Sequence, residues 1–410
     1  MNFIDLFAGA GGLSEGFIRA GYRPIAHVEL DNAACFTLRT RAVYHFLKDS
    51  GRIKEYYSYL KGEINRSDLY QKAPQEVLNS VINAAIGKNN RAIFKAIDSL
   101  RNSAQIDLIV GGPPCQAYSY IGRAALKHKK DEDERTTLYI QYGRFLKKYQ
   151  PKLFVFENVP GIKTAGNGKY YKNLKAYFKK LGYNIDDRLI NSHDFGVIQN
   201  RHRVIIMGWK EDIDFSYPEF ETVQHAWNRN TIFHDLPFIK PGYKERFCKY
   251  ACEPNNYLTD HEIRNGIDFI TQHITRPHNK RDLVIYKMAI NALENDGKRL
   301  KNNEIPKENR TQKNTTDFLD RFKVVNLTPH TMIAHIAKDG HHFIHPDKRQ
   351  LRSISIREAA RIQSFPDDFY FEGTKENQNR TPAFRQIGNA VPPLLSTIIA
   401  KGILRQLKNI

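Results

Sequence analysis

Short apolar runs alternate with helix-like segments through the first half of the chain. The runs that predict strands are bounded by polar turns, and in the segments between them apolar residues recur three or four positions apart. Strands are predicted at 2–7, 24–30, 107–110, 153–156 and 204–207, and helices at 13–20, 137–149 and 170–181. This order predicts an α/β fold with a mixed, mainly parallel sheet and helices on both faces. Residues 183–190 and 203–207 are predicted to pair antiparallel at one sheet edge.

The pattern changes after Trp209, where prolines begin to interrupt every long period. We therefore predict a first domain at 1–213 and a second, smaller and irregular domain at 214–349. The segment 350–410 is predicted to return to the first domain. In it, Ser355 and Glu358 form a capping box that starts a helix, and residues 394–407 predict a final amphipathic helix. Residues 41–105 are interpreted as an insertion rich in Lys and Tyr, to which the sequence assigns no chemistry.

Composition narrows the class of protein. The chain has 410 residues, 41% of them hydrophobic and 26% charged, which is typical of a folded protein rather than a disordered one. Its 63 Lys and Arg exceed its 44 Asp and Glu, and the resulting charge of +19 favours a nucleic acid as partner. No run approaches the ~18 apolar residues of a membrane span. We see no secretory signal, and the four cysteines are too few and too scattered for a disulfide framework, so the protein is expected to remain inside the cell.

A glycine-rich turn, FAGAGG at residues 7–12, joins the first predicted strand to the first predicted helix. Glycines let the backbone approach a ligand closely, and the N-terminus of the helix offers unpaired N–H groups. Such a turn by itself is as often structural as ligand-binding. Glu29 ends the second strand about 20 residues further on, where a carboxylate can accept hydrogen bonds from both hydroxyls of a ribose. Together the two features predict a nucleoside-containing cofactor.

Two further loops bring reactive side chains to strand ends. GGPPCQ at residues 111–116 follows the third strand, and its prolines stiffen a loop that presents the thiol of Cys115. The usual alternative for a free cysteine is an inert core residue, which the glycine and proline neighbours disfavour. FENVP at residues 156–160 ends the next strand and brings Glu157 beside the same crevice. We interpret Cys115 as a candidate nucleophile and Glu157 as a candidate acid.

Six motifs now stand in order along the chain, namely FAGAGG, GGPPCQ, FENVP, QNRHR, REAARIQSFP and QIGNAVPP. They resemble the motifs of the C5-specific DNA cytosine methyltransferases, which usually accompany bacterial restriction endonucleases. The resemblance covers residues 2–40, 98–210 and 350–400. It implies a Rossmann-like catalytic domain that binds S-adenosyl-L-methionine and a target-recognition domain that reads a short sequence in double-stranded DNA. It also implies a bacterial cytoplasmic enzyme, held at the nucleoid by DNA, that a restriction endonuclease of the same specificity accompanies.

The resemblance implies a role for each catalytic side chain. Cys115 would add to C6 of a cytosine flipped out of the duplex, while Glu157 contacts its N3 and amino group. Arg203 would hold the cytosine O2 and orient Glu157, with Arg201 in support. The alternative for two arginines in a basic chain is contact with phosphates. Where enzymes that methylate amino groups carry Asp or Asn before the two prolines, this chain has Gly112. The thiol of Cys115 indicates methylation of carbon.

The cofactor residues are likewise carried over position by position. They are Phe7, Gly9, Gly11, Gly12 and Leu13 around the methionine, Glu29 and Leu30 at the ribose and adenine, Asp98 and Ser99 at the adenine, Pro113, and Asn389 with Val391 closing the pocket. The chain departs from the family at two of these positions. Leu30 stands where many relatives have tryptophan, and Asp98 lacks the usual preceding glycine.

Two other functions fit parts of this pattern. An RNA cytosine C5-methyltransferase would carry the same motifs, but the large basic region between QNRHR and REAARIQSFP favours duplex DNA. A catalytically silent DNA-binding regulator would not need both Cys115 and Glu157. Cys248 and Cys252 form a Cys-x3-Cys pair without a second pair, so we predict no metal site.

Overall fold

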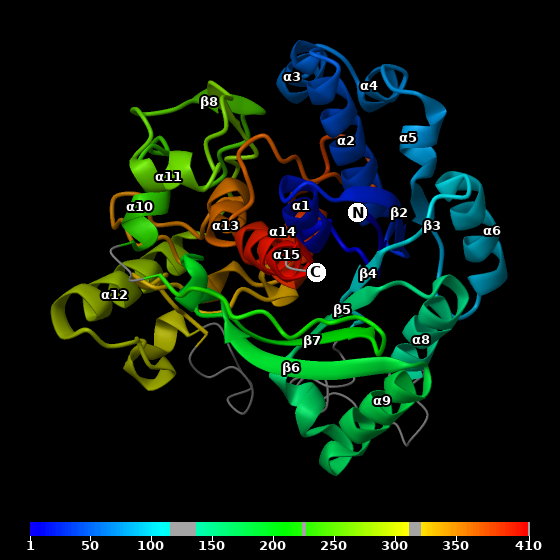
Figure 1. Cartoon of the computed structure of the whole chain (residues 1–410). Coiled ribbons are helices and arrows are strands. Elements are labelled where there is room, and N and C mark those ends of the chain that lie inside the picture. The colour runs from blue at the N-terminus through cyan, green and yellow to red at the C-terminus, as the bar shows by residue number, and fades with distance from the viewer. Residues whose placement is uncertain (115–136, 224–226, 311–320, 409–410) are drawn as a thin grey trace.

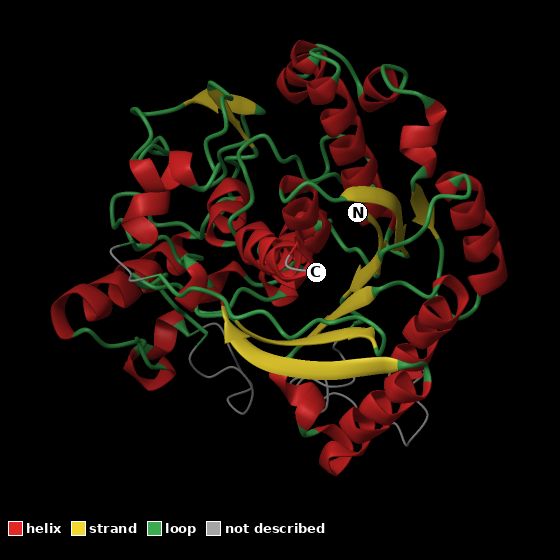
Figure 2. Cartoon of the chain, viewed as in Figure 1, coloured by secondary structure: helices red, strands yellow, loops and turns green. Residues whose placement is uncertain are grey.

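A computed structural model describes residues 1–114, 137–223, 227–310 and 321–408. Within them, a seven-stranded sheet has the order β3-β2-β1-β4-β5-β7-β6 (Figures 1 and 2). Its first five strands are parallel, and β7 runs antiparallel to both β5 and β6. The strands are β1 (Asn2–Leu6), β2 (Arg23–Glu29), β3 (Val81–Asn83), β4 (Leu108–Gly111), β5 (Leu153–Asn158), β6 (Tyr183–Asn191) and β7 (His202–Lys210). The predicted mixed sheet and its antiparallel edge pair are confirmed.

Helices cover both faces of the sheet because alternate side chains of each strand point to opposite faces. On one face, Ile4 and Leu6 of β1 pack with α6 (Asn90–Arg101), α8 (Leu138–Tyr149) and α9 (Lys169–Lys180). On the other face, Phe3 packs with α1 (Gly12–Arg19) and α15 (Pro393–Lys408). The last helix of the chain therefore lies against the first.

Glycines set the distance between α1 and α15. A Cβ atom on Gly12 would lie 2.2 Å from the carbonyl oxygen of Val391, and one on Gly16 would lie 2.2 Å from Cβ of Ser396. The hydroxyl of Ser396 donates to the carbonyl of Leu13 across the same contact. No larger residue fits at these two positions, so the glycines bring the C-terminal segment against the turn that follows β1.

The region predicted as an insertion, 41–105, contains parts of the sheet domain. Its edge strand β3 and its covering helix α6 lie inside this region, and α2 (Asn32–Asp49) runs into it. The prediction missed β3 because a three-residue strand carries too little periodic signal. The extra structure is confined to three short helices, α3 (Ile53–Lys61), α4 (Arg66–Tyr70) and α5 (Gln75–Asn79).

The part of the chain after β7 is irregular, as predicted. It contains a two-stranded sheet and several helices, namely β8 (Phe247–Lys249), β9 (Phe269–Thr271), α10 (Arg229–Phe233), α11 (Asn256–Asp260) and α12 (Lys280–Asp296). Two helices of the C-terminal segment, α13 (Ile356–Ile362) and α14 (Arg380–Asn389), share a hydrophobic core with this second domain. Helix α15 packs on the sheet, and Gln386 of α14 accepts from the hydroxyl of Thr37 in α2, so the C-terminal segment joins the two domains.

Residues Arg380–Leu407 are the one stretch of the described chain that is long and apolar enough to span a membrane. The stretch consists of α14 and α15, and 67% of its most apolar window is buried inside the protein. The hydroxyl of Tyr22 donates to the carbonyl of Ala400 from the facing core. This packing against the core explains why the stretch Arg380–Leu407 is apolar.

Helix α13 begins at the predicted capping box, in which Ser355 accepts from the backbone N–H of Glu358. Its Arg361 is fully buried between two carboxylates, at 2.5 Å from Asp235 and 2.5 Å from Asp367. Burial raises the pKa of Asp367, but the charge and hydrogen bonds of Arg361 outweigh that effect and hold the pKa below its ordinary value. This ion triad links α13 to the second domain.

We predict that Arg361→Met lowers the free energy of unfolding by about 3 kcal/mol, because it removes the cation that two fully buried carboxylates share. Asp235 keeps its pair with Arg264, and Asp367 keeps the more distant Arg357. Urea denaturation monitored by circular dichroism measures the change. The control is Arg349→Met, which removes an exposed arginine paired with Asp347 and should leave the denaturation midpoint unchanged. Equal midpoints for the two variants would contradict the assigned role of the triad.

Candidate active site

The order of the strands reverses between β1 and β4, and in sheets of this kind ligands bind at the carboxyl ends of the strands on either side of such a reversal. The predicted motifs meet there. The turn Phe7–Gly12 follows β1, Glu29 ends β2, Gly112 follows β4, and Glu157 lies near the end of β5. Sequence reasoning therefore placed these residues at one edge of the sheet correctly.

The turn after β1 has the backbone conformation that a glycine motif indicates. Phe7, Gly9 and Gly11 all adopt positive φ, at 59°, 56° and 82°. A positive φ strains a bulky residue such as Phe7, and strain of this kind concentrates at functional sites. A Cβ on Gly9 would meet nothing within 4 Å, so the turn is open on that side.

The carboxylate of Glu29 connects the turn to the end of β2. Its Oε2 accepts from the backbone N–H of Gly9 at 2.7 Å, and its Oε1 accepts from the N–H groups of Leu30 and Asp31, each at 2.8 Å. Burial raises the pKa of Glu29 and these backbone hydrogen bonds lower it, with a net rise. Leu30 beside it is 65% exposed. A carboxylate oxygen can accept more than one hydrogen bond, so Glu29 retains capacity for a ligand.

The loops after β4 and β5 are tied together. The side-chain amide of Asn158 donates to the carbonyl of Pro113 at 3.2 Å. A Cβ on Gly112 would lie 2.6 Å from Oε2 of Glu157. A larger residue at this position would therefore require the carboxylate of Glu157 to shift. Cys115, the candidate nucleophile, follows this loop but lies outside the described residues.

Arg203 and Glu157 form an ion pair. Nε of Arg203 lies 2.7 Å from Oε1 of Glu157, and both side chains are largely buried. Nη1 of Arg203 donates to the carbonyl of His202. A guanidinium so fixed holds the carboxylate in one orientation.

Arg201 contacts neither Glu157 nor Arg203 in the hydrogen bonds of the described residues. It is fully buried, and its guanidinium donates to the carbonyls of Met332 at 2.6 Å and Ala390 at 2.8 Å. It therefore joins the start of β7 to the second domain and the C-terminal segment. These contacts of the two arginines thus go to different parts of the chain, and the supporting role of Arg201 stays a prediction.

The predicted adenine residues Asp98 and Ser99 are not at this site. Both lie in the last turns of α6, and Asp98 pairs with Arg101 and Lys148. A helix that connects parallel strands runs opposite to them, so its end lies at their amino ends, away from the ligand edge. The assignment is corrected. The three-residue strand β3 gives too weak a signal in the sequence, so the adenine residues were predicted too far along the chain.

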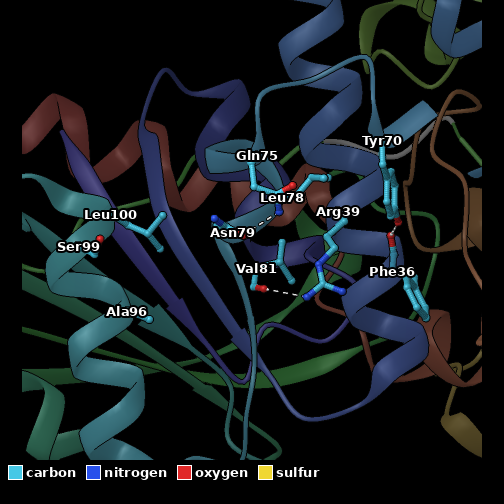
Figure 3. Close-up of a pocket in the computed structure, with 10 residues that line it drawn as sticks. All are labelled: Phe36, Arg39, Tyr70, Gln75, Leu78, Asn79, Val81, Ala96, Ser99 and Leu100. Atoms are coloured by element: carbon cyan, nitrogen blue, oxygen red, sulfur yellow. Dashed lines mark hydrogen bonds between the residues drawn. The ribbon is translucent and has the colours of Figure 1, made fainter. Parts of the chain in front are cut away.

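Ser99 instead lines a separate pocket of about 520 Å³ between α2, α5 and α6 (Figure 3). Arg39 reaches across this pocket to the carbonyl of Val81, the first residue of β3. Phe7, Gly9 and Glu29 are absent from its lining. The pocket is thus distinct from the candidate site.

Two residues that lie at the ligand edge were not predicted from the sequence. Asn83 ends β3, and its side-chain amide donates to the carbonyls of Glu29 at 3.2 Å and Leu30 at 3.0 Å. Asp5 in β1 is buried, and neither carboxylate oxygen has a hydrogen-bond partner among the described residues. Burial, and then the charge of Glu29, raise the pKa of Asp5 well above its ordinary value. A charged residue within the apolar run NFIDLF was the available signal for Asp5.

Asn389 and Val391 stand where the C-terminal segment meets the turn. Val391 packs against Leu13 in the core, and its carbonyl is the atom nearest to Gly12. Asn389 is exposed at the end of α14. The structure thus brings both close to the turn after β1, which their predicted role requires.

Among the described residues, one group of three side chains could hold a metal ion, namely His335, Asp339 and His342. Asp339 is already paired with Arg321 at 3.0 Å, and a second cation beside that guanidinium would be repelled. Cys252 lies 3.4 Å from His234, but this pair belongs to no such group. We assign no metal to the site.

Comparison with known proteins gives consistent matches over the whole chain. The family model described as C-5 cytosine-specific DNA methylase matches residues 1–68 and 67–405. The type II methyltransferase M.Bpa9945I of Bacillus paralicheniformis is 41% identical, over 98% of this chain and 98% of its own. M.DdeI of Desulfomicrobium norvegicum, another type II methyltransferase, is 30% identical, over 100% of this chain and 90% of its own.

Solved structures show the same fold. A DNA modification methyltransferase encoded within an E. coli prophage superposes with a TM-score of 0.65 at 22% identity, covering 100% of this chain and 99% of its own. The methyltransferase EhMeth of Entamoeba histolytica gives a TM-score of 0.54 at 15% identity, covering 99% and 98%. The predicted Rossmann-like fold is confirmed.

We predict that Gly112→Ala costs about 1–3 kcal/mol of stability, because the new methyl group would overlap the carboxylate of Glu157. The variants Gly112→Ala, Glu157→Ala and the double variant form a double-mutant cycle with the wild type, and urea denaturation measures the stability of each. The cost should largely vanish once the Glu157 side chain is removed. An unchanged cost in the Glu157→Ala background would show that the contact with Glu157 is not its cause.

Proposed function

This chain belongs to the C-5 cytosine-specific DNA methylase family, and on that premise we propose that it methylates carbon 5 of a flipped-out cytosine through a covalent bond to Cys115. The methyl donor is S-adenosyl-L-methionine. The observation that carries this proposal is the Arg203–Glu157 ion pair, held against Gly112 at the edge of the sheet where the Cys115 loop begins. A DNA-binding regulator without catalysis has no need for this buried pair.

The residues at the carboxyl ends of β1 and β2 suit S-adenosylmethionine. The donor carries an ammonium group, which a carboxyl can bind. The carboxyl of Asp5 is buried on the sheet face that α1 covers, and it lacks a partner among the described residues. Glu29 can accept the ribose hydroxyls, and exposed Leu30 with Asn83 can border the adenine. We propose Asn83 in place of Asp98 and Ser99. Phe7, Gly9, Gly11, Gly12, Leu13, Pro113, Asn389 and Val391 complete the proposed pocket.

Bound S-adenosylmethionine supplies an electrophilic methyl group. Carbon 5 of an unmodified cytosine is too weak a nucleophile to attack it. In our proposal the thiolate of Cys115 adds to C6, and the ring electrons move towards C5 and N3. Glu157, oriented by Arg203 and carrying a proton in this step, donates to N3 and accepts from the amino group, so it stabilises the negative charge that develops at N3. After C5 is methylated, loss of its proton restores the double bond and expels the thiolate.

Residues 214–349 are proposed as the target-recognition domain and residues 1–213 as the catalytic domain, with 350–410 joining them. The target base must leave the stack to reach Cys115, at a cost of a few kcal/mol. The net charge of +19 can offset part of this cost through contacts with phosphates. Arg, Lys and Asn side chains of the second domain would read base edges in the major groove.

The cellular setting follows from the relatives. M.Bpa9945I and M.DdeI are named as type II methyltransferases. We propose that this chain likewise acts in the bacterial cytoplasm on nucleoid DNA and protects a short sequence from a restriction endonuclease. No stable complex between the two enzymes is needed, because both recognise the DNA independently.

The function is tested by bisulfite sequencing of DNA from cells that express the chain. We expect 5-methylcytosine in one short sequence context, and none with Cys115→Ser, since a serine hydroxyl is too weak a nucleophile for the addition. DNA with 5-fluorocytosine at that position should trap a denaturation-resistant adduct with the wild type, because fluorine cannot leave as the proton does. Methylation by Cys115→Ser, or an active wild type without adduct, would contradict the covalent route.

We predict that Glu29→Ala weakens S-adenosylmethionine binding, measured by titration calorimetry, by roughly 10- to 100-fold through loss of hydrogen bonds to a charged group. The rate at saturating cofactor should change little. Glu55→Ala serves as the matched control, because Glu55 lies on α3 and its ion pairs within the described part of the chain are with Arg52 and Lys72. Equal cofactor affinity in the two variants would remove Glu29 from the pocket.

A further inference from the structure

A short segment of the second domain, Pro329–Ile333, lies along the start of β7. The backbone N–H of Asn200 donates to the carbonyl of Pro329 at 2.9 Å, and the hydroxyl of Thr331 donates to the carbonyl of Asn200 at 2.5 Å. Asn200 and His330 also form a parallel β-bridge. The segment is therefore bonded to the sheet domain as a short additional strand would be.

Gln199 fixes the position of this segment. Its side-chain oxygen accepts from the N–H of Met332 at 2.8 Å, and its amide nitrogen donates to Gln363 at 2.9 Å and to the carbonyl of Ile362 at 3.2 Å. Gln199 is fully buried. Displacing Met332 would leave polar groups unsatisfied away from water, so the junction resists small shifts.

The junction is close in the chain to the candidate catalytic pair, since Arg203 is three residues after Asn200. Asn200 is followed by Arg201, which holds Met332 and Ala390, and then by Arg203, which holds Glu157. Side chains two positions apart in an extended chain point to the same side. A change in the position of Pro329–Ile333 therefore changes the backbone from which Arg203 reaches Glu157.

We propose that Thr331 and Gln199 are positioning residues that couple recognition of the DNA target to the orientation of Arg203 and Glu157. The inference rests on the proposed function. A second domain seated correctly on its target holds Pro329–Ile333 against Gln199–Arg201 and thereby keeps Glu157 in position for the cytosine. A poorly seated domain loosens the same bonds, so a wrong sequence lowers turnover as well as affinity.

The test removes the hydroxyl bond across the junction with Thr331→Val, which keeps the size of the side chain. We expect kcat on the target sequence to fall roughly 5- to 10-fold, the worth of one hydrogen bond expressed in the reacting geometry. KM for DNA and cofactor affinity should change less than about twofold. Thr331→Ser, which retains the hydroxyl, should restore kcat.

The control is Thr397→Val, which removes a hydroxyl bond to the carbonyl of Pro393 within α15 and crosses no junction. Its kcat should equal that of the wild type. Thr331→Val should also have little further effect in a Glu157→Gln background, because its effect passes through Glu157. As a second junction variant, Gln199→Met removes the bond to Met332 and should lower kcat in the same way.

The outcomes separate the two proposals. A wild type that produces no 5-methylcytosine contradicts the proposed function. With an active wild type, the coupling is overturned if Thr331→Val leaves kcat unchanged. It is overturned equally if the effect appears only as weaker DNA binding or adds fully to that of Glu157→Gln.

Discussion

The buried guanidinium of Arg201 is the contact on which the arrangement of the whole site depends. A charge without water must be satisfied by polar atoms, and here they are carbonyl oxygens from the second domain and from the end of α14. Three separate parts of the chain must therefore meet at the start of β7. Arg203, which pairs with Glu157, is two residues further along the chain.

The same principle governs the rest of the domain junction. Arg352, Arg357 and Arg361 of the C-terminal segment are all fully buried, and each donates to a group of the second domain, namely the carbonyls of Ile239 and Thr271 and the carboxylate of Asp235. Ion pairs of this kind contribute little net stability compared with apolar packing, but breaking one is costly. They therefore favour one placement of the C-terminal segment on the second domain, which an apolar interface alone would define less sharply.

The short helices α3 to α5 add a second connection between the domains. Tyr59 and Leu60 pack in one cluster with Ile267 and Phe269 of the second domain, and Arg246 donates to the carbonyls of both Tyr59 and Leu60. Figure 1 shows α3 near β8, away from α9 and α12. This segment, to which the sequence assigned no chemistry, braces the second domain against the sheet domain.

The sequence by itself determined the type of fold and most of the candidate site. Glycine turns and short apolar strands are local signals, so FAGAGG, Glu29, Gly112 and Glu157 could be assigned to strand ends without coordinates. The capping box at Ser355 is also local, and the structure has it as predicted. The chemistry of Cys115 remains a prediction from its motif.

Tertiary structure alone decided which residues meet across long separations. It placed Asp98 and Ser99 away from the ligand edge and Asn83 at that edge, because a helix that covers parallel strands ends at their amino edge. It separated Arg201 from Arg203, assigning one to the domain junction and the other to Glu157. It also showed that the carboxyl group of Asp5 is buried. Burial and partners of a side chain depend on segments hundreds of residues away, and no local pattern encodes them.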